Sequence, residues 1–114
     1  MAILILRSKA SPEQIGEMAK DYQGYIKLVV DVERKILAGG GEKHVDGEQL
    51  LLKDGSKQED LWGGGIDWET KEMDYNMDYN SVINLRPRQE NPSRDILSLE
   101  IRKRFDRIVK ELLL

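Results

Sequence analysis

The chain has 114 residues, a formal net charge of -3 and 34% charged residues of both signs. This length suits a single domain over residues 1–114, and the mixed charge predicts no general binding to nucleic acid. The sequence contains no cysteine, which excludes disulfides, thiolate nucleophiles and cysteine-built zinc sites. The apolar run after Met1 is too short for a signal sequence or a membrane span, so we expect a cytoplasmic protein without membrane association.

The N-terminal segment predicts a strand followed by a helix. Ala2–Leu6 is a short apolar run with β-branched members, which is typical of a strand inside a sheet and covered on both faces. An S-x-x-Q capping box then begins at Ser11, with proline at the first helical position. We therefore expect a helix over Pro12–Gln23 that ends at Gly24.

The segment Tyr25–Ala38 fits two patterns, because its apolar residues alternate as in a strand while a subset of them nearly fits one helix face. Its β-branched residues favour strands. The polar Glu33–Lys35 between two apolar runs predicts a hairpin turn, with Ile36–Gly39 returning antiparallel, although no Asn-Gly or Asp-Gly pair marks the turn.

The middle of the chain predicts a short helix. Asp46 and Gln49 resemble a second capping box, which favours a helix over Gly47–Lys53. A hairpin turning at Asp54–Gly55 is the competing interpretation.

Two further strands are predicted at Asp60–Gly63 and Ser81–Arg86, which could pair across the intervening segment. That segment includes Met73–Asn80, a tandem copy of MDYN, which we interpret as a duplication tolerated in an exposed loop. The alternative is that Tyr75 and Tyr79 form a paired aromatic surface for a partner.

The last helix follows Ser98, a plausible N-cap, and carries an apolar stripe that includes Phe105 and Val109. Together these elements predict an α+β domain with a mostly antiparallel sheet of about four or five short strands. We expect the N-terminal and C-terminal helices to cover one face of this sheet.

A histidine and acidic cluster is the first candidate site. On an extended backbone Glu42, His44 and Asp46 share one face and supply possible ligands for a divalent cation. His44, Asp46 and Glu59 are the corresponding catalytic candidates, with Glu59 as a possible base. The competing interpretation, in which Asp46 caps a helix and His44 only forms hydrogen bonds, is favoured because such clusters arise by chance in charged proteins.

An arginine-rich loop is the second candidate site. Arg86, Asn91 and Arg94 precede the last helix, and their planar donor groups suit a carboxylate or phosphate. In the competing interpretation these arginines form internal ion pairs that hold the loop.

Three segments carry a resemblance to a known family: GGGEKHVDGE, DGSKQEDLWG and INLRPRQENPSR, followed by the terminal helix. The chain resembles, over nearly its whole length, a family of small bacterial and archaeal proteins known as a domain of unknown function. The resemblance implies family membership and brings no activity, cofactor or catalytic residue.

Two functional hypotheses follow. The first is a non-enzymatic binding or regulatory domain without a cofactor that acts by protein association, with the apolar Leu112–Leu114 end available for a homodimer. The second is a metal-assisted phosphoester hydrolase, or a nucleotide- or anion-binding protein, in which both polar clusters face one cleft. The second hypothesis requires His44 and Arg86 to point into a common pocket.

Overall fold

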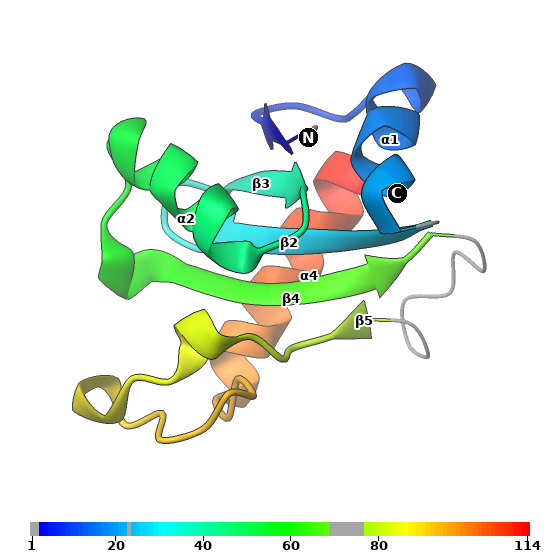
Figure 1. Ribbon diagram of the computed structural model, residues 1–114. Coiled ribbons are helices and arrows are strands. Elements are labelled where there is room, and N and C mark those ends of the chain that lie inside the picture. The colour runs from blue at the N-terminus through cyan, green and yellow to red at the C-terminus, as the bar shows by residue number, and fades with distance from the viewer. Residues whose placement is uncertain (1–2, 23, 69–76) are drawn as a thin grey trace.

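The computed structural model describes residues 3–22, 24–68 and 77–114 and has the predicted α+β class. Its five strands form one antiparallel sheet in the order β1-β3-β2-β4-β5 (Figure 1). None of the helices in these ranges is long and apolar enough to cross a membrane. The strands are β1 (Ile3–Leu6), β2 (Tyr25–Asp31), β3 (Ile36–Gly40), β4 (Leu61–Asp67) and β5 (Met77–Asp78). The α-helices are α1 (Pro12–Ala19), α2 (His44–Lys53) and α4 (Leu99–Leu113), and the 3-10 helices are η1 (Lys20–Tyr22), η2 (Gln58–Asp60), η3 (Val82–Asn84) and η4 (Pro87–Gln89).

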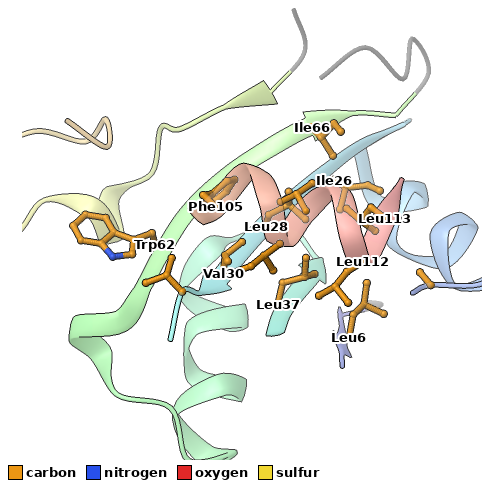
Figure 2. Close-up of a cluster of buried hydrophobic side chains, with 14 of the residues drawn as sticks. Leu6, Ile26, Leu28, Val30, Leu37, Trp62, Ile66, Phe105, Leu112 and Leu113 are labelled. Carbon is orange, nitrogen blue, oxygen red and sulfur yellow. The ribbon is translucent and has the colours of Figure 1, made fainter. Parts of the chain in front are cut away.

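Helices cover both faces of the sheet. Figure 1 shows α4 behind the strands and α2 in front of them. The helices α1 and α4 share one core cluster with the sheet, so they cover the same face as predicted. That cluster is shown in Figure 2 and includes Leu28, Leu37, Phe105, Val109 and Leu113. The opposite face packs against α2 and η3 through a second cluster of Val29, Ala38, Leu51, Leu61 and Ile83, a layer that the sequence did not predict.

The N-terminal strand lies at an edge of the sheet, and the prediction of an inner strand was wrong. Among the described strands, β1 pairs only with β3, from Ile3 opposite Gly40 to Leu6 opposite Leu37. The predicted capping box of α1 is confirmed by both of its hydrogen bonds, 3.2 Å and 2.9 Å long. The helix passes into η1 after Ala19, earlier than predicted.

The hairpin between β2 and β3 is confirmed, and a side chain forms its turn. The Asp31 carboxylate accepts hydrogen bonds from the backbone N–H groups of Glu33 (3.0 Å) and Arg34 (2.8 Å). Lys35 then adopts a left-handed φ of 59°. An aspartate that bonds the backbone two residues on supports a tight turn without Asn-Gly.

The short helix α2 is confirmed, and the competing hairpin is wrong. It begins at His44, earlier than predicted, so Asp46 lies in its first turn and does not cap it. Lys43 occupies the N-cap position and makes no side-chain capping bond.

The strand β4 is longer than predicted and pairs with β2, not with Ser81–Arg86. The predicted strand over Ser81–Arg86 is wrong, because Ser81 caps η3 by accepting a hydrogen bond from the Ile83 N–H at 3.3 Å. A capped 3-10 turn gives these backbone groups local partners in place of a neighbouring strand.

The second MDYN copy contributes to the fold, so the prediction of an exposed loop was wrong for it. Met77 pairs with Ile66 across β4 and β5. The Tyr79 ring packs edge-on against Phe105 with centroids 5.6 Å apart. Residues 73–76, including Tyr75, lie outside the described residues.

Candidate functional site

The candidate site is built on a row of three residues that runs across neighbouring strands of the sheet. Lys27 of β2 is the cross-strand partner of Gly65 of β4, and Gly65 is the partner of Asp78 of β5. Directly paired residues point to the same face, and Lys27 shares that face with Val29, which packs against the α2 layer. Lys27 and Asp78 therefore flank a position without a side chain on the α2 face.

The space above Gly65 is filled by a tyrosine. The Tyr25 hydroxyl donates a hydrogen bond to the Asp78 carboxylate, and a Cβ atom added at Gly65 would overlap the Tyr25 ring. Burial raises the pKa of Tyr25, and the hydrogen bond to the negative Asp78 raises it further. Tyr25 is therefore a fixed hydroxyl donor and not a proton acceptor at neutral pH.

His44 lies next to this row at the first position of α2. Its Nε2 is 2.6 Å from the Gly64 carbonyl oxygen. A carbonyl oxygen can only accept, so Nε2 carries the proton. Burial lowers the pKa of His44 and outweighs the Gly64 carbonyl, which raises it, while Lys27 and Arg94 lower it further and Asp78 opposes them. His44 is therefore a neutral imidazole whose Nδ1 carries the lone pair.

The lowered pKa of His44 predicts a loss of stability in mild acid. The unfolded chain binds a proton at His44 near pH 6.5, whereas the folded protein does so only at lower pH. Above this range the neutral His44 contributes its full stability. The free energy of unfolding should then fall as the pH drops from the unfolded-state pKa to the folded-state pKa, by at most about 1.4 kcal/mol per pH unit. Urea unfolding between neutral pH and pH 5 measures this slope.

The matched variant for this prediction is His44→Gln, whose amide keeps a donor for Gly64 without titrating. The difference between the two unfolding free energies should shrink toward acid pH. Because the chain has a single histidine, its imidazole NMR signal also reports the folded-state pKa directly. A titration midpoint at or above the ordinary histidine value would contradict the prediction.

Arg94 adds a positive charge to the same region. Its backbone carbonyl is held by the Ser81 N–H at 3.0 Å and by the Asn84 side-chain amide at 3.0 Å. Its exposed guanidinium has no hydrogen bond or ion pair with the described residues, and its charge reaches His44. We name the group of Tyr25, Lys27, His44, Asp78 and Arg94 the His44 site.

Arg86, which was predicted to bind an anion, lies outside the His44 site, and its guanidinium is held by groups of its own chain. Its guanidinium donates to the backbone carbonyls of Ile83 (2.9 Å), Gln58 (2.6 Å) and Leu61, and to the Gln89 side chain (3.2 Å). Four of the five N–H donors of an arginine are thus used within the protein.

The position of Arg86 also separates the two predicted clusters. Its guanidinium lies 4.3 Å from the centroid of the Trp62 ring, and Trp62 belongs to the core on the α4 face. His44 bonds the Gly64 carbonyl and Arg86 bonds the Leu61 carbonyl, so the two side chains contact different parts of β4.

Asn91, which was predicted to bind an anion, is buried, and its side chain bonds the backbone of its own loop. It is 2% exposed, and its side-chain amide donates to the carbonyls of Asn84 (2.7 Å), Ser93 (3.0 Å) and Asp95 (2.9 Å). Its oxygen accepts from the Leu97 N–H at 3.0 Å. The competing interpretation of an internally held loop is supported here, although backbone hydrogen bonds replace the expected ion pairs.

The predicted metal ligands do not converge. Within residues 3–22, 24–68 and 77–114, no group of three or more His, Asp and Glu side chains could hold a metal ion. Glu42 precedes α2, Asp46 lies in its first turn and Glu59 is exposed in η2. These residues therefore provide neither a common cation site nor a catalytic base beside His44.

Sequence reasoning missed three members of the His44 site. Lys27 interrupts the apolar run of β2, which is the one signal that could have marked it. Tyr25 and Asp78 join it only through the strand register.

The sequence did not predict that two carboxylates, those of Asp31 and Glu48, are buried. Asp31 Oδ2 and Glu48 Oε2 have no hydrogen-bond partner in the described part of the chain. Burial lowers the pKa of the Arg86 guanidinium, and the negative charge of Glu48 partly offsets this effect by raising that pKa.

One family model matches the chain, over residues 4–112, and its description is "Protein of unknown function (DUF5674)". No curated protein and no solved structure matches the chain at a significant level.

Proposed function

The chain belongs to this family of proteins of unknown function, and because the family supplies no reaction we propose from the geometry that it is a binding module for a small anion at the His44 site. The observation that supports the proposal is the exposed Arg94 guanidinium, which has no side-chain partner among the described residues and whose positive charge reaches the neutral His44 held at the Gly64 carbonyl. Proteins commonly hold carboxylates and phosphates with such guanidinium groups.

The charges of the site favour an anion over a cation. Lys27 and Arg94 are positive, and the N-terminus of α2 adds a partial positive charge because no side chain caps it. The negative Asp78 is already bonded by the Tyr25 hydroxyl and by the Asn80 N–H at 3.1 Å. The site therefore combines two positive side chains and a helix N-terminus with the negative Asp78, and Asp46 lies in the first turn of the same helix.

The neutral His44 further restricts the chemistry of the ligand that would fit the site. Its Nδ1 accepts a hydrogen bond, so the preferred ligand carries a hydroxyl donor next to its negative charge. Monohydrogen phosphate has both features in one group. We propose recognition of this chemistry without a chemical step.

Inorganic phosphate should raise the thermal stability of the protein at constant ionic strength. A ligand at one hundred times its dissociation constant stabilises the folded state by about 2.7 kcal/mol. Arg94→Ala should lose most of this response, because the mutation removes the free cation and keeps the backbone carbonyl that Ser81 and Asn84 hold. Thermal unfolding and isothermal titration calorimetry with phosphate, against a chloride reference, measure both effects.

Arg88→Ala is the matched control, since Arg88 is an exposed arginine in η4 outside the His44 site. It should bind phosphate like the unmodified chain. If both variants lose the phosphate response equally, general charge screening explains it and the His44 site does not. The absence of any heat of binding at millimolar phosphate would reject the proposal.

A second candidate function is protein association. The C-terminal end gives it little support, because Leu112 and Leu113 are 6% and 2% exposed and belong to the core of their own chain. Single exposed apolar residues such as Val82 and Leu99 are normal on protein surfaces. The free edge of β1 is the stronger support.

A further inference from the structure

The two edges of the sheet are protected very differently. At the β5 edge, Tyr79 accepts a hydrogen bond from the Ile96 N–H at 3.1 Å, and Asn80 forms a bridge with Asp95. Where β5 ends, side chains of η3 and of the loop after it bond the part of β4 that β5 does not pair with: Asn84 bonds Gly63 and Arg86 bonds Leu61. Side chains and loops therefore occupy backbone groups that would otherwise attract another strand.

The β1 edge has no such protection among the described residues. β1 pairs with β3 on one side, and no described segment pairs with its other side. Its sequence ILIL has no charge and no proline, and Ile3, Leu4 and Ile5 are half-buried. Natural proteins usually block an open edge with a lysine, a proline, a bulge or a covering segment, or keep the strand very short, because unpaired backbone groups bind further strands. Of these features β1 has only the short length, at four residues.

We infer that β1 is a self-association surface, where a second copy of this chain adds its own β1 antiparallel about a two-fold axis. Such an edge is self-complementary, since each outward N–H meets a carbonyl of the copy and each outward carbonyl meets an N–H. The strand carries no charge, so the axis brings no like charges together.

The side chains of β1 fit the same arrangement. Ile3 and Ile5 pack against the α2-side cluster, while Leu4 and Leu6 pack against the α4-side cluster. Pairing two copies would join both apolar layers across the axis and withdraw the half-buried side chains from water. The inference rests on the second candidate function and is independent of the His44 site, which lies over β2, β4 and β5.

Proline variants of the full-length chain test this surface. Consecutive residues of a strand direct their N–H groups to opposite edges, so one of Leu4 and Ile5 directs its N–H outward. Proline there is compatible with an edge strand, whereas proline at the other position removes a bond to β3. In sedimentation velocity from micromolar to millimolar concentration, we expect the unmodified chain to form a dimer. The proline variant that keeps its circular dichroism spectrum should be a monomer.

Amide hydrogen exchange keeps the test informative if both proline variants unfold. In the dimer the outward amide of β1 should be protected at high concentration and lose that protection on dilution. Leu99→Lys is the control, because Leu99 is 72% exposed away from β1, and it should dimerise normally. A strict monomer at all concentrations overturns the inference. A dimer that persists in the folded proline variant, or that Leu99→Lys dissociates, rejects the β1 surface while leaving protein association standing.

Discussion

We expect Asn84→Ala to lower the free energy of unfolding by about 3 to 5 kcal/mol, because one buried amide would leave several backbone groups without partners. Asn84 is 0% exposed. Its oxygen accepts from the Gly63 N–H at 2.8 Å, and its amide group donates to the Gly63 carbonyl at 2.9 Å. The side chain thus pairs with β4 as a neighbouring strand would. It also holds the carbonyls of Tyr79 (2.9 Å) and Arg94 (3.0 Å).

The isosteric Asn84→Asp variant separates hydrogen bonding from packing. Its size is unchanged, but a carboxylate oxygen would face the three carbonyls that the amide now serves, so the loss should equal or exceed that of Asn84→Ala. Asn80→Ala is the control, since Asn80 is exposed and its side chain makes one bond, to Asp95 at 3.0 Å. Urea unfolding followed by tryptophan fluorescence and circular dichroism gives the three values. Losses no larger at Asn84 than at Asn80 would contradict this account.

Local signals in the sequence predicted most elements of the fold. The capping box at Ser11 and the β-branched residues of β2 act within a few residues, and the elements they predict are present. The segment Ser81–Arg86 misled because its β-branched Val82 and Ile83 are typical of a strand. Its structure depends instead on Asn84, whose partners on β4 are distant in sequence. Tertiary contacts override strand propensity in such cases.

The candidate site was harder to predict than the fold. His44 and Arg94 were identified from residue type, but their neighbours Lys27 and Asp78 come from strands whose order was unknown. A cross-strand row exists only once the register is fixed, and one residue of slip would turn these side chains to the other face. Arg86 shows the opposite error, because its residue type suggested a ligand while its donors bind the backbone of its own chain.

The burial of β1 shows the same limit. Its apolar residues predicted coverage on both faces, which the two core clusters confirm. Hydrophobicity reports which faces of a strand are covered, but it does not report whether both edges are paired. The prediction for β1 was therefore right about its covered faces and wrong about the pairing of its outer edge.

Gly64→Ala should be among the most destabilising single substitutions in the chain, at a cost of about 3 kcal/mol or more. A Cβ atom at Gly64 would overlap the backbone carbonyl oxygen of Asp78 and lie 2.8 Å from the Phe105 ring. The ring has some freedom to move, whereas the carbonyl is part of β5 and is fixed by the pairing of β4 with β5. Relief of the carbonyl overlap therefore requires β5 to separate from β4, and a shift of α4 would relieve only the contact with Phe105.

Two further variants identify the cause of that loss. Gly64→Ala combined with Phe105→Leu should recover little stability, because the smaller side chain relieves the ring contact and leaves the carbonyl in place. Gly16→Ala is the matched control: Gly16 lies in α1 with nothing within 4 Å of its added Cβ. It should stabilise the protein by about 0.5 to 1 kcal/mol, since alanine loses less backbone entropy in a helix. If Gly64→Ala and the unmodified chain have equal urea midpoints, β5 moves easily and the account is wrong. If the double variant recovers fully, the strain comes from Phe105 alone.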